Sequence, residues 1–187
     1  QGAWYDAERG VAFGHRRLAI IGLGESGAQP MVSASGRYTI TFNGEIYNHL
    51  ELRSELADIS FQNEWRGQSD TETLLACIER FGFQETLRKC IGMFALAVWD
   101  AEKQTISLAR DRIGEKPLYY GIFGGTFAFA SELGAFPQYG GDNLKLNPDA
   151  VAAFMRHGYV PQPYSIYKSI SKLMPGTWLE FTKANLE

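Results

Sequence analysis

The run from Asn43 to Asn48 gathers in one short stretch the residue types that amide chemistry requires. It follows the apolar stretch from Tyr38 to Phe42 and precedes a helical pattern, so we expect it on a turn between a strand and a helix. The Asn43 amide and the Gly44 N–H could hold a developing oxyanion, and the Glu45 carboxylate could hold an ammonium group. These groups suit an amino acid whose side-chain amide is being cleaved. Taken alone, Asn-Gly-Glu is also typical of a surface turn that begins a helix.

A site for a free amino acid also needs a cation for the α-carboxylate. Arg17 suits this role, because a guanidinium pairs with a carboxylate in a bidentate fork, whereas Arg16 is explained as a surface charge. Asp70 follows Ser69 at the start of a predicted helix, where the helix dipole stabilises an acidic side chain without any ligand. His15 lies in a predicted strand, and we expect it to have a structural role.

The elements around these residues predict an α+β protein. Hairpins dominate over strand–helix alternation, which favours antiparallel sheets with helices packed outside them. Capping patterns place helix starts at Asn48 with Glu51, at Ser69 with Glu72, and at Asn147-Pro148. Expected strands are 11–21, 38–42, 93–99, 105–109, 118–123, 126–130 and 177–181; expected helices follow residues 48, 69 and 147, with a short one at 83–88.

Several motifs occur in a particular order along the chain. They are Gly14 to Ile21, Gln29-Pro30-Met31, Asn43 to Asn48, Gln68 to Glu72, Gly92 to Ala97 and Ala109 to Tyr120. In that order the sequence resembles the glutamine amidotransferase domain of the asparagine synthetase family, the class II or N-terminal-nucleophile type. The resemblance covers nearly the whole chain and implies a four-layer αββα sandwich of the N-terminal-nucleophile hydrolase type, with the first strand missing. It makes residues 1–187 a single domain, in which about 142–187 form a tail towards an absent synthetase domain.

The resemblance also implies a role for each candidate residue. Asn43 and Gly44 would form the oxyanion hole. Glutamine would be bound by Arg17, by the backbone of Leu18, Ala19, Ile20 and Ile21, by Asn43, Gly44 and Glu45, and by Asp70, whose carboxylate would hold the substrate ammonium. Arg110 and Asp111, in the last motif, are interpreted as scaffold residues that form a salt bridge.

The nucleophile is where this sequence departs from the family pattern. Family members use an N-terminal cysteine whose own α-amine acts as base. This chain begins with Gln1, and its cysteines, Cys77 and Cys90, are internal. We therefore expect residues 1–187 alone to be inactive. With a cysteine ahead of Gln1, its thiolate would attack the glutamine amide, water would release glutamate, and ammonia would pass to a synthetase domain that amidates ATP-activated aspartate.

Two alternatives fit an absent nucleophile. The β-lactam synthetases share this architecture and keep the N-terminal domain as a non-hydrolytic scaffold. A regulatory module that binds glutamine is the second alternative. Retention of Arg17, the Asn43–Glu45 run and Asp70 argues against the scaffold, because a scaffold does not need a glutamine site. The sequence leaves the amide acceptor open, since relatives amidate carboxylates other than aspartate.

Composition excludes several classes of protein. With 187 residues, 45% hydrophobic and 21% charged, the chain is typical of one globular domain. A net charge of −3 gives no reason to expect nucleic acid or an anionic membrane surface, and no stretch is long and apolar enough for a membrane span. The cysteine count favours a reducing cytoplasm, and no spacing predicts a metal site. We expect no cofactor in this domain, ATP and Mg in the synthetase domain, and a possible homodimer.

Overall fold

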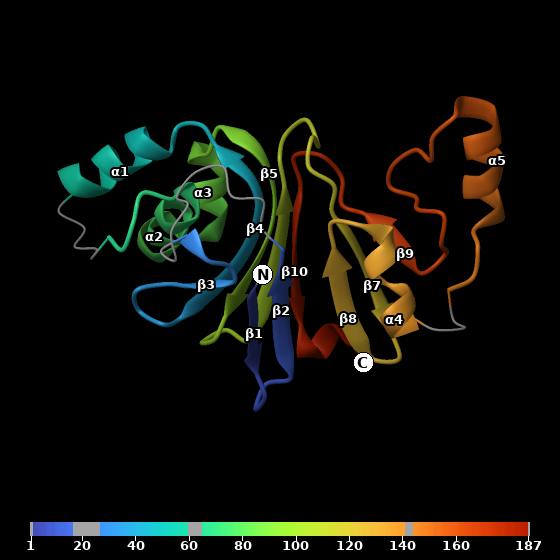
Figure 1. Ribbon diagram of the computed structural model, residues 1–187, viewed down its shortest axis with the longest axis horizontal. Coiled ribbons are helices and arrows are strands. Elements are labelled where there is room, and N and C mark those ends of the chain that lie inside the picture. Colours follow the sequence, from blue (N-terminus) through green and yellow to red (C-terminus); the bar gives the residue numbers. More distant parts are fainter. Residues whose placement is uncertain (1, 17–26, 60–64, 141–143, 187) are drawn as a thin grey trace.

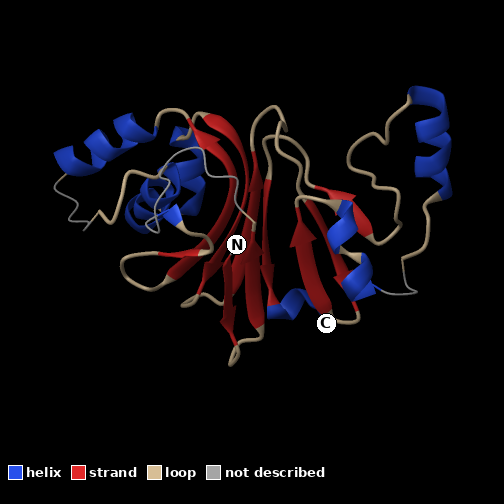
Figure 2. Ribbon diagram, viewed as in Figure 1, coloured by secondary structure: helices blue, strands red, loops and turns tan. Residues whose placement is uncertain are grey.

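The computed structural model describes residues 2–16, 27–59, 65–140 and 144–186. Two antiparallel sheets face each other in the middle of the molecule, and helices cover the outer face of each sheet (Figure 1). Figure 2 shows the same layers by type, with the strands central and the helices outside. The predicted αββα arrangement is therefore present. No helix in the described ranges is long and apolar enough to cross a membrane.

The sheets differ in size. The larger has the order β10 (Trp178–Thr182), β6 (Thr105–Arg110), β5 (Gly92–Asp100), β4 (Tyr38–Ile46) and β3 (Met31–Val32). The smaller has the order β8 (Thr126–Ala130), β7 (Tyr119–Phe123) and β9 (Ile170–Lys172). A separate hairpin joins β1 (Gly2–Asp6) to β2 (Val11–His15). The helices are α1 (His49–Asp58), α2 (Asp70–Phe81), α3 (Phe83–Lys89), α4 (Pro137–Gly140) and α5 (Pro148–His157), with short 3₁₀ turns at Leu133–Ala135 and Lys183–Leu186.

Alternation along the strands divides the core into layers. On β5, Leu96 and Val98 face α1, α2 and α3, whereas Ala97 and Trp99 face the smaller sheet. The second group joins Phe13 of β2 in the core between the two sheets. A third cluster of Phe123, Phe136 and Ile170 lies on the smaller sheet. The two sheets are thus held face to face by a continuous apolar layer.

Several predicted elements are confirmed. Ser69 caps α2 by accepting a hydrogen bond from the Glu72 N–H at 3.2 Å, and the helix ends before Gly82. Asn147 caps α5 by accepting from the Asp149 N–H at 3.1 Å. The predicted hairpins β5–β6 and β7–β8 are both present and antiparallel.

Two local predictions were wrong. The Asn43–Ile46 run is not a turn, because β4 continues to Ile46 and pairs with β5 along its whole length. Asn48 does start α1, but its side chain makes no capping bond. It instead donates to the Lys89 carbonyl at 3.0 Å and accepts from the Ile91 N–H at 2.9 Å. Its amide therefore fastens α1 to the segment between α3 and β5.

The segment expected to form the tail of the domain contributes one strand to each of the two sheets. β9 pairs with β7, and β10 pairs with β6. Within this segment, α5 stands apart from the sheets: it lies at the far end of the molecule from α1, beyond the smaller sheet (Figure 1). Residues 170–182 thus belong to the body of the domain.

Arg110 and Asp111 organise the loop between β6 and β7 without pairing with each other. The Asp111 carboxylate is 2% exposed. It accepts from five backbone N–H groups, those of Phe94, Ile113, Gly114, Glu115 and Lys116. The Arg110 guanidinium donates to the carbonyls of Lys116, Gly114 and Leu173 and to the Gln162 side chain. No salt bridge joins Arg110 to Asp111 within the described ranges, so the scaffold interpretation holds in a different form from the one expected.

Replacing Asp111 by asparagine is expected to lower the free energy of unfolding at pH 7 by about 3 kcal/mol, because an amide nitrogen would face buried N–H donors. Burial alone would raise the pKa of Asp111, but the backbone donors outweigh it and hold that pKa below its ordinary value. A depressed folded-state pKa gives stability that is present above the unfolded value of about 3.9 and is lost as pH falls through the folded one. Urea unfolding measures this.

Exposed Asp58, at the end of α1, is the matched control. Asp58→Asn should change the unfolding free energy by less than about 0.5 kcal/mol. The difference in unfolding free energy between the parent protein and Asp111→Asn should become smaller below about pH 4. If this difference in unfolding free energy stayed constant down to pH 2, the stabilisation could not be assigned to the ionised Asp111 carboxylate.

Candidate active site

Strand β4 presents the candidate polar residues on the face turned towards the smaller sheet. Phe42 and Ile46 pack into the core under the helices, so the alternating residues Asn43 and Glu45 face the opposite way. The Asn43 Nδ2 donates to the Ser131 Oγ at 3.3 Å, and Ser131 directly follows β8. The Asn43 amide therefore reaches across the space between the two sheets.

The backbone of Gly44 has its own orientation. Directly after β4, the Tyr47 N–H donates at 2.8 Å to the carbonyl of Ile91, the residue before β5. Opposite Gly44, both backbone groups of Phe94 are bonded on the other side of β5, to Asp111. Because successive N–H groups of a strand point in opposite directions, the Gly44 N–H points away from β5. It faces the edge of β4 beyond the short pairing with β3, which reaches only Ile40.

The neighbouring N–H groups on that edge are occupied by side chains. The Phe42 N–H donates to the Gln29 Oε1 at 2.7 Å, and the Ile46 N–H donates to the Asp70 Oδ2 at 3.0 Å. Between them, the Gly44 N–H has no hydrogen-bond partner among the residues that the structure describes. Within the described ranges, the Gly44 N–H is thus unpaired between two strand N–H groups that are bonded.

Only glycine fits at position 44. A Cβ there would overlap the Met93 carbonyl oxygen and lie 2.7 Å from the Phe94 Cα, and the φ angle is +156°. Gly92 on β5 meets the same restriction against the Glu45 carbonyl oxygen. The two glycines let β4 and β5 approach closely at the site, which is the physical reason for a glycine between Asn43 and Glu45.

Asp70 lies at the first position of α2 and is 7% exposed. Its Oδ2 accepts from the Ile46 N–H and its Oδ1 accepts from the Thr71 N–H at 2.9 Å. A carboxylate has about four acceptor positions, so two remain for another donor. The structure therefore places a second carboxylate one residue along β4 from Glu45.

Glu45 itself is half-buried. No hydrogen bond or ion pair joins its carboxylate to another residue in the described ranges. A half-buried carboxylate without a protein partner is costly unless it is solvated or meets a cation. Its position suits the binding of an ammonium group.

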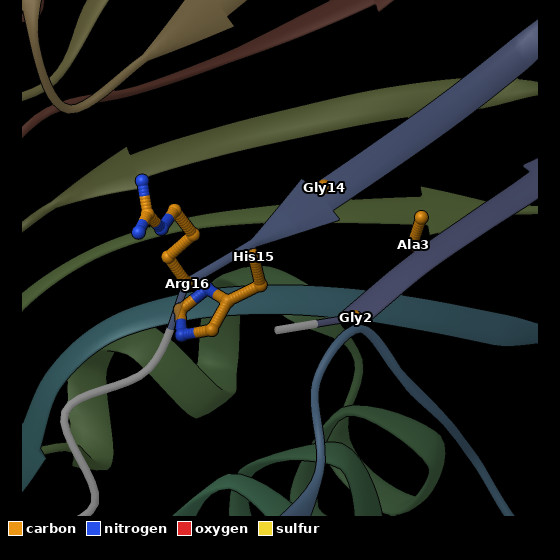
Figure 3. A pocket seen from close by; sticks show the side chains of 5 residues that line it. All are labelled: Gly2, Ala3, Gly14, His15 and Arg16. Carbon is orange, nitrogen blue, oxygen red and sulfur yellow. The ribbon is translucent and has the colours of Figure 1, made fainter.

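A hollow of about 550 Å³ opens at the ends of β1 and β2, lined by Gly2, Ala3, Gly14, His15 and Arg16 (Figure 3). The His15 imidazole turns towards β4, where its Nδ1 lies 3.0 Å from the Thr41 Oγ1. The Arg16 side chain points away from the imidazole. His15 therefore anchors β2 to β4, as a structural role predicts, two residues from Asn43.

Neither cysteine of the chain can be the nucleophile of this site. Cys77 and Cys90 are fully buried in the core under the helices, on the side of the large sheet opposite Asn43 and Glu45. Burial raises the pKa of each thiol to about 12, so almost no thiolate exists near neutral pH. Within the described ranges, no group of three histidine, cysteine or acidic residues could hold a metal ion.

Sequence reasoning and structure overlap only in part at this site. The structure brings together Asn43, Gly44, Glu45 and Asp70. The first three are consecutive, whereas Asp70 is distant from them in sequence and reaches the site through its bond to the Ile46 N–H. The other predicted residues, Arg17, Leu18, Ala19, Ile20 and Ile21, lie outside the described residues. Sequence reasoning gave no individual role to Gln29 or Ser131, whose contacts with β4 depend on long-range folding. Gln29 was visible only as a member of a motif.

The antiparallel layers and the solved structure that they match place the fold among the N-terminal-nucleophile amidotransferases. Glutamine phosphoribosylpyrophosphate amidotransferase from Bacillus subtilis, solved with ADP and GMP, matches 67% of this chain and 28% of its own, with a TM-score of 0.57 and 27% identity. The family-wide pattern of the glutamine amidotransferase domain matches residues 1–187. The chain belongs to that family.

Two curated relatives carry the name asparagine synthetase (glutamine-hydrolysing). The putative enzyme 2 of Methanocaldococcus jannaschii is 37% identical over 179 residues, covering 87% of this chain and 34% of the relative. Enzyme 1 of Bacillus subtilis is 36% identical over 173 residues, covering 92% of this chain and 27% of the relative. The chain thus spans about a third or less of the length of these relatives.

Proposed function

We propose that this domain binds glutamine and supports hydrolysis of its side-chain amide, as the glutaminase part of an asparagine synthetase-like enzyme. Asn43 and Gly44 would stabilise the oxyanion that forms on the amide oxygen when the amide carbon is attacked. Glu45 and Asp70 would hold the substrate ammonium, and Arg17 would hold the α-carboxylate. The backbone of 18–21 would also contact the glutamine. The family resemblance supports this assignment for 17–21, which the described residues do not include.

The observation that carries the proposal is the Gly44 N–H. It points to the edge of β4 beyond the pairing with β3, has no partner in the described part of the chain, and is adjacent to Asn43, whose amide faces the space between the two sheets. Removing one oxyanion donor typically costs about 10²–10³ in rate. An N–H on a surface without function could equally well bond to water. Here Glu45 and Asp70 lie beside it, and they add the carboxylates that the ammonium group of an amino acid requires.

The reaction would begin with a cysteine thiolate supplied from ahead of Gln1. The thiolate attacks the amide carbon, and Asn43 and Gly44 hold the oxyanion. The α-amine of the same cysteine, which took the thiol proton, gives that proton to the nitrogen as the C–N bond breaks, so ammonia leaves and the thioester forms. Water then releases glutamate. In the proposed whole enzyme, ammonia reaches a synthetase domain that uses ATP and Mg to activate aspartate. The two unpaired cysteines support a reducing compartment such as the cytoplasm.

A polypeptide of residues 1–187 alone is expected to release no glutamate from glutamine above a blank, because Cys77 and Cys90 are buried with thiol pKa values raised to about 12. A coupled glutamate assay measures this, and mass spectrometry after thiol labelling should find both cysteines unmodified until the protein is unfolded. Catalysis by the isolated polypeptide would contradict the assignment of the nucleophile.

The full-length protein is the decisive comparison. Glutamate release by the full-length protein supports the proposal. Saturable glutamine binding without release would support a regulatory module instead, and neither binding nor release would support the scaffold alternative. Isothermal titration calorimetry with glutamine distinguishes the regulatory module, which binds glutamine, from the scaffold, which does not.

A further inference from the structure

Gln29 has a pattern of contacts that the glutaminase chemistry leaves unexplained. Its side chain is 7% exposed. The Oε1 accepts from the Phe42 N–H at 2.7 Å, and the Nε2 donates to the Thr71 Oγ1 at 3.3 Å. An amide oxygen only accepts and an amide nitrogen only donates, so the Phe42 N–H fixes which end faces the strand. Both ends of a buried amide are thereby used to join β4 to α2.

Asp70 makes the corresponding connection on the other side of Gly44. It bonds the Ile46 N–H of β4 and the Thr71 N–H of α2. Thr71 therefore receives both links, one at its hydroxyl and one at its N–H. The start of α2 is joined to the edge of β4 at two N–H groups, and the Gly44 N–H, which has no partner in the described part of the chain, lies midway between them.

We propose that Gln29 is a positioning residue of the oxyanion hole: it occupies the Phe42 N–H and fixes the β4 edge against α2, so that Gly44 offers the N–H that has no partner among the described residues. This inference rests on the proposed glutaminase function. Without the Gln29 amide, a second unpaired N–H would open about 7 Å along the strand. One of the two connections that hold Gly44 relative to Asp70 would also be lost.

Gln29 adjoins the start of the hairpin that forms the hollow. A Cβ on Gly2 would overlap the Gln29 carbonyl oxygen and lie 3.3 Å from the Pro30 Cδ. The Gln29 backbone thus contacts the beginning of β1 while its side chain holds β4. Gln29 therefore contacts β1, β4 and α2, the helix that carries Asp70.

Positioning and simple structural support predict different kinetics. An oxyanion exists only in the transition state, so a misplaced donor lowers kcat and leaves substrate binding largely intact. Glu45 and Asp70 would still hold the ammonium end of glutamine. A purely structural role predicts a lower Tm with kcat unchanged in the folded fraction.

The test uses Gln29→Met in the full-length protein, because methionine keeps the volume and loses both hydrogen bonds. We expect kcat for glutamate release to fall between about 10- and 100-fold, with KM changed less than about threefold. Gln162→Met is the matched control: Gln162 also precedes a proline and bonds the Arg110 guanidinium at 3.1 Å, but it is exposed and outside the site. The kcat of Gln162→Met should equal that of the parent protein.

Thr71→Val provides a second, independent variant, since it removes the hydroxyl that accepts from Gln29 and keeps the shape of the side chain. It should lower kcat by less than Gln29→Met, and the double variant should lose no more than Gln29→Met alone, because both changes break one connection. If Gln29→Met fails to fold, the Thr71→Val result decides: a lowered kcat supports positioning, and an unchanged kcat overturns it.

The failure of this inference and the failure of the proposed function differ in outcome. A parent protein that releases no glutamate would refute the glutaminase function, and the positioning role with it. An active parent protein together with a Gln29→Met variant whose kcat matches that of Gln162→Met would refute positioning by Gln29 and leave the function intact. A Gln29→Met variant whose defect lies wholly in KM would also overturn the inference.

Discussion

Replacing Gly44 by alanine in the full-length protein is expected to lower glutamate release by more than about 10²-fold and the free energy of unfolding by about 1–3 kcal/mol. The added Cβ would overlap the Met93 carbonyl oxygen and crowd the Phe94 Cα. Both are backbone atoms of β5, so neither can rotate away. β4 must therefore move from β5, and the Gly44 N–H moves with it. Steady-state kinetics and urea unfolding measure the two losses.

Gly134 supplies the matched control for this change. It lies in the 3₁₀ turn Leu133–Ala135, an added Cβ would meet nothing within 4 Å, and its φ angle lies outside the range that strains other residues. Gly134→Ala should change the unfolding free energy by less than about 0.5 kcal/mol. Parent-like kcat in Gly44→Ala would show that the position of this N–H does not matter to catalysis, and the oxyanion assignment would fail.

The elements that the sequence predicted well are those whose signals are local. The cap of α2 needs only Ser69 and the N–H of Glu72, and the helix end needs only Gly82. The β7–β8 hairpin turns at Gly124-Gly125, where both residues have positive φ angles of 55° and 79°. In each case the residues that determine the structure lie within about one turn of one another. The tertiary contacts of these elements are therefore not needed to predict where they begin and end.

The length of β4 could not be predicted because its last residues depend on distant partners. Asn-Gly usually marks a turn. Here Gln29 and Asp70 supply hydrogen bonds to the β4 edge, and Gly92 on β5 makes room for the Glu45 carbonyl. These contacts make strand geometry favourable where local preference indicates a turn. A local rule fails at the candidate site, as functional sites often require.

The candidate site shows the same division. Asn43 and Glu45 share a face because side chains alternate along a strand, a relation that the sequence alone would give once the strand is known. Asp70 joins them through one bond to the Ile46 N–H, and no pattern in the sequence specifies that bond. The separation of Arg110 from Asp111 is of the same kind, since each takes backbone partners from a folded loop. Composition and spacing indicate which residues matter, and the topology decides what each of them contacts.

Asn43→Ala is expected to lower kcat for glutamate release by about 10²–10³-fold in the full-length protein, because it removes the side-chain donor to the oxyanion. It also removes the 3.3 Å hydrogen bond to the Ser131 Oγ. Ser131→Ala separates the two effects, since it breaks the same hydrogen bond and keeps the Asn43 amide. One such bond is worth about 1 kcal/mol.

The two variants should therefore lower the free energy of unfolding by similar amounts, while Ser131→Ala should lower kcat by no more than about tenfold. Parallel measurements of kcat, KM and urea unfolding on both proteins give the comparison. Equal losses of kcat would mean that Asn43 acts by connecting β4 to the end of β8, which would leave the Gly44 N–H as the sole oxyanion donor in the proposal. A large loss of kcat in Asn43→Ala alone would assign the amide to the reacting oxygen, because the connection between the sheets is lost in both.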